Sequence, residues 1–439
     1  MAAYGLGDFT INTALTSLSL VYASYFLTQV VGLPGTLAGL VPLIARAVDA
    51  FTDPLMGRIS DRTTWRGGRR RPYFLIGAIP LGVAFAMLWW SIPVESQFIK
   101  FTYYVSVYCS LSLAITVLAV PYLALMPEMA TGYDARTTLN TWRNAGSLLG
   151  VFAAIGIRPV AEALGGGSSG FAIAGAIYGL LIALPWWVVH RVSFERSDFQ
   201  GRVSEVGFFD TLRLVLSNRT FAQLTGLYLF GRIAMDMIST LLILYFTFWI
   251  GRSGDFELFM GFFIFCVMLS LPGWLRIAPR FDKSTLFIFG SLWWAAFQVV
   301  TIFFDSESPR WLLFGYGALA AIGYAVVDLM PWAMVGEAVD ADELASGERR
   351  EGIYNGVFTF LRKLAGALAV FLVLSFLDVL GFVQGDEQTE TVRQAIRWLT
   401  GTLPVVCLLV SVQIARGYPL TREAHEEIVR QLEARGAAS

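Results

Sequence analysis

Long apolar segments alternate with short polar stretches along the whole chain. A helix needs roughly 20 mostly apolar residues to cross ~30 Å of hydrocarbon at 1.5 Å per residue. The pattern predicts twelve such helices, of which the second and tenth contain polar interruptions and the eleventh is long. Their limits are 9–32, 36–59, 73–94, 101–126, 138–161, 170–189, 221–250, 257–275, 285–304, 311–337, 353–383 and 396–415.

Composition supports an integral membrane protein. Residues of the AVILMFWYC class make up 56% of the 439 residues and charged residues 15%, whereas soluble domains have about 25% charged residues. The net charge of −1 gives no indication of a nucleic-acid partner. With 3 Cys and 2 His, the chain lacks the parts of a disulfide framework, a Cys/His metal site or a His-based catalytic triad. We therefore expect neither an enzyme nor an organic cofactor.

Basic residues predict the orientation, because Lys and Arg are retained on the cytoplasmic side. With an inside N-terminus, 20 of the 32 Lys and Arg fall in cytoplasmic loops and the tail, 6 in outer loops and 6 within or beside spans. Both termini are then cytoplasmic, and the bacterial inner membrane is the expected location. The chain divides into a first six-helix bundle (1–190), a cytoplasmic linker (191–220), a second six-helix bundle (221–415) and a cytoplasmic tail (416–439). The amphipathic FFDTLRLVL in the linker favours a helix on the membrane surface, although a solvated linker fits equally.

Two carboxylates inside the second span are the strongest functional signal. Charged residues in spans are costly, and they usually face the bundle interior and mark a pathway. Asp49 and Asp53 are four residues apart, which places them ~40° apart around the helix and ~6 Å apart along it. With the Thr52 hydroxyl they offer hard oxygen ligands to a small cation such as Na⁺, and they could equally hold a proton. In the alternative interpretation, Asp49 pairs with Arg46 and Asp53 only accepts hydrogen bonds.

Three further charged residues predict a polar cavity for a solute. Asp8 opens the first span, Arg143 lies in the fifth and Lys363 lies deep in the eleventh. Opposite charges from different spans can neutralise one another when the cavity is empty and bind a polyhydroxylated solute when it is filled. A permanent structural ion pair is the alternative. For a second set of charged residues in the spans, a structural or gating role fits as well as solute contact: Arg232, Asp236, Asp328, Arg362 and Asp378.

Aromatic residues near these charges could stack on a sugar face. The candidates are Tyr122, Trp142, Trp332 and Tyr354.

The loop after the second span is GRISDRTTWRGGRRRP. It predicts a conformational latch, meaning charged contacts that hold the cytoplasmic ends of two helices together in one conformation. A glycine permits close helix approach, an acid stands at the helix end and a cluster of Arg follows. The latch residues are Gly57, Asp61, Arg62, Arg69 and Arg70. The alternative is an ordinary Arg-rich cytoplasmic loop.

Several segments together resemble the glycoside-pentoside-hexuronide:cation symporters of the major facilitator superfamily, the group that contains the melibiose permease. They are YGLGDF, RAVDAFTDPLMGRISDRT with RRRPY, AVPYLALMPEM with YDARTTLNTWRNAGSLLG, and EAVDADELASGERREGIYNGVFTFLRKLAGA. The resemblance implies two six-helix bundles around a central cavity, worked by alternating access.

The resemblance also implies roles for individual residues. The cation-binding acids of the permease match Asp49 and Asp53, and Thr52 and Thr116 match the polar residues beside them. Its sugar-contacting residues match Asp8, Arg143 and Lys363.

Two fourth-helix sugar contacts of the permease are replaced here by Ala119 and Leu123. Animal members of the family carry lysolipids with sodium, so these two apolar residues favour a less polar solute.

Our expectation is therefore a cation-coupled symporter of a small organic solute, namely a sugar or glycoside, with a lysolipid or another amphiphile as the alternative. The coupling cation is Na⁺, H⁺ or Li⁺, which the same carboxylates serve. We expect the protein to work as a monomer in the bilayer.

Overall fold

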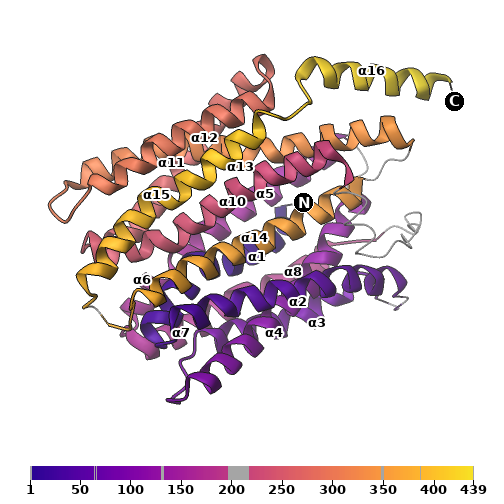
Figure 1. Cartoon of the computed structure of the whole chain (residues 1–439). Coiled ribbons are helices and arrows are strands. Elements are labelled where there is room, and N and C mark those ends of the chain that lie inside the picture. The colour runs from indigo at the N-terminus through magenta and orange to yellow at the C-terminus, as the bar shows by residue number, and fades with distance from the viewer. Residues whose placement is uncertain are drawn as a thin grey trace. The chain divides into compact units, whose positions relative to one another are not determined.

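A computed structural model of the chain describes residues 2–63, 65, 67–129, 133–195, 217–347, 351–385 and 387–438. Within these ranges every regular element is a helix (Figure 1). The chain forms two compact units. Unit 1 is Met1–Glu205 with Phe371–Gln388, and unit 2 is Val206–Val370 with Thr389–Ser439. Residues 196–216 of the expected linker, including its candidate surface helix, lie outside the described residues.

Unit 1 contains the first half of the apolar segments. Its elements are η1 (Ala2–Gly5), α1 (Leu6–Ser17), η2 (Leu18–Val30), α2 (Gly35–Arg62), α3 (Pro72–Leu88), α4 (Gln97–Met129), α5 (Tyr133–Ile155), α6 (Ile157–Ala163), α7 (Gly167–Ala183) and α8 (Pro185–Val192). The helix α1 continues directly into η2, because Leu18 keeps helical dihedral angles.

Unit 2 contains the second half. Its elements are α10 (Arg219–Leu244), η3 (Tyr245–Trp249), η4 (Ser253–Asp255), α11 (Phe256–Ile277), η5 (Ala278–Arg280), α12 (Lys283–Val300), η6 (Thr301–Phe303), α13 (Arg310–Ser346), α14 (Glu351–Val379), α15 (Glu390–Ala415) and α16 (Arg422–Ala438). The last part of α14, from Phe371 onward, belongs to unit 1.

Each of the twelve predicted segments coincides with a described helix or with helices joined end to end. Ten of these are long and apolar enough to cross a membrane. The other two segments lie in α1 with η2 and in α3, an apolar helix of 17 residues. The third predicted segment extends to residue 94, but α3 ends at Leu88. Pro93 follows closely, and a proline disfavours helical geometry in the residue before it and cannot donate to the helix.

Glycines allow close helix contacts within unit 1. A Cβ atom added to Gly146 would lie 2.1 Å from the carbonyl oxygen of Gly5, and one added to Gly150 would lie 2.3 Å from that of Phe9. This Gly-x-x-x-Gly spacing puts two small residues on one face of α5, so the backbones of α1 and α5 touch.

The end of α14 packs on α2 in the same way. Cβ atoms added to Gly35 and Gly39 would overlap the backbone of Leu374 and Phe371. The backbone N–H and hydroxyl of Thr36 also donate to the Asp378 carboxylate at 3.1 and 2.7 Å. Asp378 therefore has a structural role in unit 1.

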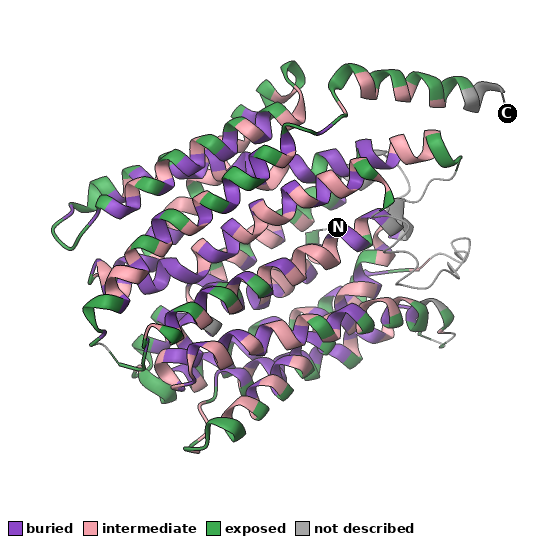
Figure 2. Cartoon of the chain, in the orientation of Figure 1, coloured by how far each residue is buried: buried purple, intermediate pink, exposed green. Residues whose placement is uncertain are grey.

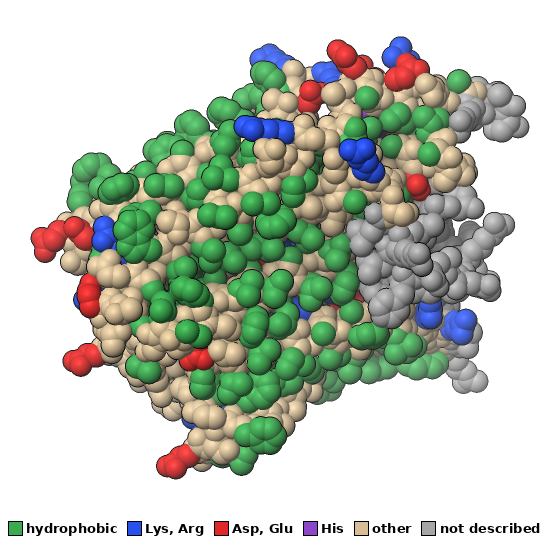
Figure 3. Space-filling view, in the orientation of Figure 1, with side chains coloured by type: hydrophobic (Ala, Val, Ile, Leu, Met, Phe, Trp, Pro, Cys, Tyr) green, Lys and Arg blue, Asp and Glu red, His purple; other side chains and the backbone are tan. Residues whose placement is uncertain are grey.

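The surface of the helices is apolar, as contact with lipid requires. Figure 2 shows exposed residues in stripes along the helices, and Figure 3 shows hydrophobic side chains covering much of the visible face. Exposed apolar side chains include Phe51, Leu180, Leu269 and Phe376, at 63, 62, 63 and 51%.

Replacement of Gly150 by Ala should destabilise unit 1. The added methyl group meets the Phe9 backbone, and overpacking of this kind costs about 1–3 kcal/mol. We expect a lower thermal unfolding midpoint in detergent. Gly315→Ala is the matched control, because a Cβ atom at Gly315 of α13 meets nothing within 4 Å. Equal midpoints for Gly150→Ala and the wild type would show that α1 and α5 are not in backbone contact.

Candidate functional site

The two faces of α2 differ in polarity. Phe51, Leu55 and Ile59 form one stripe of the helix and are 63, 55 and 45% exposed. Asp49 lies on the opposite face and is 2% exposed, and Asp53 follows one turn later. The carboxylates are therefore turned into unit 1, as burial of charge away from lipid requires.

Both oxygens of Asp49 have polar neighbours. Arg46 donates to Oδ2 at 2.7 Å, and the hydroxyl of Ser112 in α4 donates to Oδ1 at 2.5 Å. The Arg46–Asp49 ion pair proposed from sequence as the alternative is thus present. This ion pair neutralises the carboxylate of Asp49. The carboxylate of Asp53 lies one helical turn further along α2.

Asp53 lies among hydroxyl groups. The hydroxyl of Thr116, one turn after Ser112 in α4, donates to Oδ1 of Asp53 at 2.6 Å. The hydroxyl oxygen of Thr52 is buried and has no hydrogen-bond partner among the described residues. Since carboxylate and hydroxyl oxygens are ligands for small hard cations, this group of α2 and α4 side chains can accept Na⁺, Li⁺ or a proton. We call Asp49, Thr52, Asp53, Ser112 and Thr116 the α2–α4 site.

Sequence reasoning missed Ser112. A signal was available, because Ser112 and Thr116 are four apart in α4, the same spacing as Asp49 and Asp53 in α2. Residues four apart lie on one face of a helix, and in the structure each hydroxyl of the α4 pair donates to one carboxylate of the α2 pair.

A second polar cluster in unit 1 joins residues that the sequence separates widely. Arg143 of α5 binds Asp8 of α1 with both ends of its guanidinium, at 2.7 and 3.1 Å. The Tyr122 hydroxyl donates to Asp8 at 2.6 Å, and the guanidinium of Arg143 lies 5.4 Å from the centre of the Tyr122 ring. Three of the expected solute-binding residues therefore lie together. Asp8 and Arg143 form a neutral ion pair, and the Tyr122 hydroxyl is hydrogen-bonded to Asp8.

The Tyr122 side chain is fully buried, and the other candidate aromatic residues differ in exposure. Trp142 is 47% exposed. In unit 2, Trp332 is 37% exposed, whereas Tyr354 is 1% exposed and packs against Phe221 with 4.7 Å between ring centres. The structure thus places Tyr354 in the core of unit 2, while Trp142 and Trp332 have accessible ring surface. Lys363 lies in the part of α14 that belongs to unit 2.

The expected latch loop binds an acid that sequence reasoning did not select. The backbone N–H groups of Arg69, Arg70 and Arg71 donate to the carboxylate of Glu195 at 2.7, 2.8 and 2.9 Å. Gly68 precedes them with a φ of +111°, and a Cβ atom there would lie 2.7 Å from Glu195. Although partial burial acts in the opposite direction, these three hydrogen bonds hold the pKa of Glu195 below its ordinary value.

Two of the other expected latch residues, Arg62 and Gly57, make little contact in this structure. Arg62 is exposed, and a Cβ atom on Gly57 would meet only Val120, at 3.9 Å. The side chain of Asp61 lies outside the described residues. The side chain of Arg70 donates to the carbonyl oxygen of Ala124 at 2.6 Å, which fixes the loop to α4.

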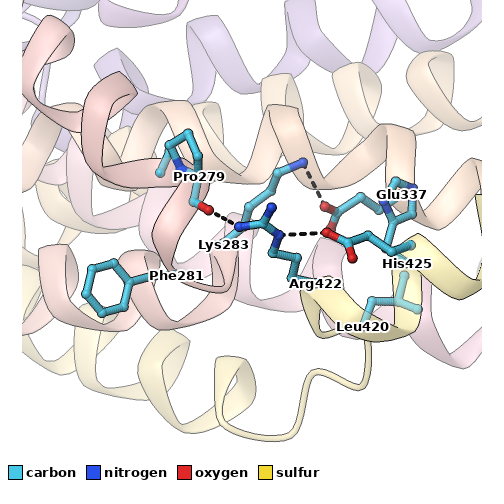
Figure 4. A pocket seen from close by; sticks show the side chains of 9 residues that line it. Pro279, Phe281, Lys283, Glu337, Leu420, Arg422 and His425 are labelled. Atoms are coloured by element: carbon cyan, nitrogen blue, oxygen red, sulfur yellow. Dashed lines mark hydrogen bonds and ion pairs between the residues drawn. The ribbon is translucent and has the colours of Figure 1, made fainter.

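A pocket of about 270 Å³ lies in unit 2 between α16, α12 and α13, outside all the predicted sites (Figure 4). Lys283 binds Glu337 at 2.7 Å and Arg422 binds Glu426 at 2.8 Å. Arg422 also donates to the carbonyl oxygen of Pro279, and His425 contacts Asp340 at 3.0 Å. These contacts attach α16 to unit 2, and they leave the charged side chains of the pocket matched in pairs.

Known structures share this arrangement of helices. The crystal structure of a bacterial homologue of the human lysosomal transporter Spinster matches 98% of this chain and 97% of its own, with a TM-score of 0.72 at 14% identity. This chain therefore has the same fold as that protein.

Comparison of sequences gives the family. The family described as MFS/sugar transport protein matches residues 3–422. An uncharacterised symporter of Synechocystis is 30% identical over 99% of this chain and 96% of its own length. A putative 2,3-dihydroxypropane-1-sulfonate exporter of Salmonella typhimurium is 30% identical over 99% of this chain and 95% of its own length. A glucuronide carrier homologue of Escherichia coli is 26% identical over 99% of this chain and 95% of its own length.

The family description and the symporters among the relatives show that this chain is a secondary transporter. The chain belongs to the MFS/sugar transport family, as its resemblance to the cation symporters implied. It is a multi-pass protein of the bacterial inner membrane and not an enzyme.

Replacement of Glu195 by Gln should reduce stability in a pH-dependent way. A carboxylate whose pKa is lowered in the folded state stabilises the protein at pH values above its ordinary pKa of 4.5. This contribution is lost as the pH falls through the pKa of the folded state. We expect the wild type to unfold at a higher temperature than Glu195→Gln at neutral pH, and the difference to shrink below pH 4.5. A difference that is constant with pH would show that the Glu195 charge is not what the loop binds.

Proposed function

We propose that this protein is a cation-coupled symporter that carries a small polyhydroxylated organic solute, a sugar or glycoside, by alternating access. The observation that carries the proposal is the α2–α4 site, in which two carboxylates on one face of α2 meet two hydroxyl groups of α4 within 2.6 Å or less. Arg46 neutralises Asp49, and the carboxylate of Asp53 one turn later, beside the hydroxyls of Thr52 and Thr116, is where a small cation can bind reversibly.

The Asp8–Arg143–Tyr122 cluster supports a polar solute. Its hydrogen bonds are made between side chains of α1, α4 and α5, and hydroxyl groups of a solute can replace them one for one. Polar groups fixed in an otherwise apolar site discriminate strongly against solutes that cannot form these bonds. The family description and the glucuronide carrier homologue agree with a sugar-like solute, and the comparisons do not favour the lysolipid alternative.

Coupling then follows from the cost of burying charge. Cation binding neutralises α2 and favours the conformation that binds solute, because a ligand shifts an equilibrium by its difference in affinity for the two states. A site that contains only one of the two ligands leaves charge or unsatisfied polar groups to be enclosed, and this opposes the conformational change. We propose that the protein does this as a monomer, with Na⁺, Li⁺ or H⁺ as the cation.

Replacement of Asp53 by Asn should abolish the response to the coupling cation. The amide keeps the shape of the side chain and removes its charge, so the site loses the group that attracts the cation. We expect purified wild-type protein to be stabilised against heat when Na⁺ or Li⁺ replaces K⁺, or when the pH is lowered, and Asp53→Asn not to respond. In proteoliposomes, Asp53→Asn should fail to accumulate solute in response to a cation gradient.

The α4 hydroxyls give a graded test with a matched control. Thr116→Val removes the donor to Asp53, and a hydrogen bond to a charged group contributes about 1.5–3 kcal/mol, so the cation concentration for half-maximal response should change roughly ten-fold or more. Thr102→Val in the same helix removes a hydroxyl that bonds only to Phe98 of its own helix, and it should behave as wild type. Cation-driven accumulation by Asp53→Asn at the wild-type level would disprove the proposed site.

A further inference from the structure

The Asp8–Arg143–Tyr122 cluster of unit 1 is built around the first turn of the chain. Tyr4 and Gly5 of η1 are buried, and Tyr4 is 0% exposed. A Cβ atom added to Gly5 would lie 2.4 Å from the carbonyl oxygen of Trp142 in α5, so the backbone of η1 touches α5. The turn that precedes Asp8 is therefore a packed part of unit 1.

Tyr4 and Tyr122 bind each other twice. The Tyr4 hydroxyl donates to the backbone carbonyl of Tyr122 at 2.5 Å, and the Tyr122 hydroxyl lies 2.8 Å from the backbone carbonyl oxygen of Tyr4, to which it can donate. The two rings are stacked with centres 4.3 Å apart. Because these contacts are reciprocal, the place of Tyr122 in α4 is fixed relative to η1.

The Tyr122 hydroxyl has two acceptors for a single proton. It lies 2.8 Å from the carbonyl oxygen of Tyr4 and 2.6 Å from Oδ2 of Asp8. A phenol has one O–H donor, and hydrogen bonds to an ionised acceptor are the stronger ones. The Asp8 carboxylate therefore attracts the proton more strongly, and the Tyr4 carbonyl is a second acceptor within reach.

The Tyr122 ring is confined by its neighbours. The Tyr4 ring stacks on it, and the Trp186 ring packs edge-on with 5.7 Å between ring centres. A Cβ atom added to Gly7 would lie 2.5 Å from Cε2 of Tyr122, so the glycine before Asp8 provides the space that the ring fills. Since the ring is held in place, its proton changes acceptor by rotation about the C–O bond alone.

A solute can reach the ion pair but not the two tyrosines. The Asp8 and Arg143 side chains are each 15% exposed, whereas Tyr4 and Tyr122 are 0% exposed. Arg143 and Tyr122 both donate to Oδ2 of Asp8, at 2.7 and 2.6 Å, while Oδ1 accepts a longer bond of 3.1 Å from Arg143. Tyr4 and Tyr122 therefore act on a solute through Asp8.

We propose that Tyr4 is a positioning residue of the solute site. Its two hydrogen bonds with Tyr122 hold the Tyr122 hydroxyl against Asp8, and its carbonyl oxygen accepts that proton when a solute hydroxyl binds Asp8 instead. Without this second acceptor, solute binding would leave a buried donor without a partner, which is costly. The inference rests on the proposed transport function and adds to it a residue that the solute does not touch.

The test is the solute affinity of Tyr4→Phe, measured from thermal stabilisation of the purified full-length protein. The probes are D-glucose, D-galactose and D-xylose with their methyl β-glycosides, each in Na⁺ and in K⁺. The probe that stabilises the wild type at the lowest concentration is then titrated. Because a neutral hydrogen bond changes an equilibrium by a few-fold to about ten-fold, the half-saturating concentration should rise roughly three- to ten-fold in the variant.

A double variant separates positioning from general destabilisation. Tyr122→Phe removes the proton that Asp8 and Tyr4 share, so its half-saturating concentration should rise roughly ten-fold or more. If Tyr4 acts through the Tyr122 hydroxyl, Tyr4→Phe should add less than about two-fold in the Tyr122→Phe background. Gly7→Ala displaces the same ring without removing a hydrogen-bonding group, and it should weaken solute binding as well.

Tyr178→Phe is the matched control. The Tyr178 hydroxyl also donates to a backbone carbonyl of another helix, that of Ala153 at 2.7 Å, and Tyr178 is 6% exposed. This variant should lose thermal stability as Tyr4→Phe does and keep the solute affinity of the wild type. Stabilisation by the coupling cation alone should be unchanged in both variants, because neither tyrosine belongs to the α2–α4 site.

The outcomes distinguish this role from the transport function. Unchanged solute affinity in Tyr4→Phe or in Gly7→Ala, an equal loss in Tyr178→Phe, or a full additional loss in the Tyr122→Phe background would overturn the positioning role and leave the proposed function intact. If no probe stabilises the wild type, the assignment of the cluster to a sugar solute fails, and the positioning role fails with it. Affinity that depends on Tyr4 in a protein that shows no cation-driven accumulation would refute symport alone.

Discussion

The cost of placing charge inside apolar helices governs this structure. Each charged side chain in the spans must be turned inward and matched, and the ion pairs Arg46–Asp49, Asp8–Arg143 and Arg232–Asp236, all 2.7 Å long, show how this is done. The carboxylate of Asp53 follows the Arg46–Asp49 pair one turn later in α2, where the Thr116 hydroxyl donates to it, and the proposed mechanism places the coupling cation there. Arg362 of α14 lies beside the Trp332 ring.

Much of the fold could be predicted from sequence because it follows from one-dimensional patterns. Apolar length located the twelve segments, although it placed the end of α3 at residue 94 and the helix ends at Leu88. The spacing of Asp49 and Asp53 located half of the α2–α4 site, and the family resemblance added Thr116. The location of both termini on the cytoplasmic side remains a prediction.

The missed residues depend on contacts between helices. Ser112 and Glu195 are ordinary polar residues in the sequence, and only the packing of α4 on α2, and of the loop before α3 on the segment after α8, gives them a role. Tyr354 was selected because it lies near charged positions in the sequence, and the structure shows its ring buried against Phe221. Arg362 was noted from its position in a span, but its isolation from described carboxylates required coordinates.

The most direct measurement of this account is the binding affinity of the wild type for a sugar or glycoside that stabilises it against heat, with and without the coupling cation at constant ionic strength. The account predicts that the cation tightens solute binding, that the solute tightens cation binding by the same factor, as linkage requires, and that both effects vanish in Asp53→Asn. A solute affinity that is the same with and without every cation tried, from Na⁺ and Li⁺ to protons, would contradict it.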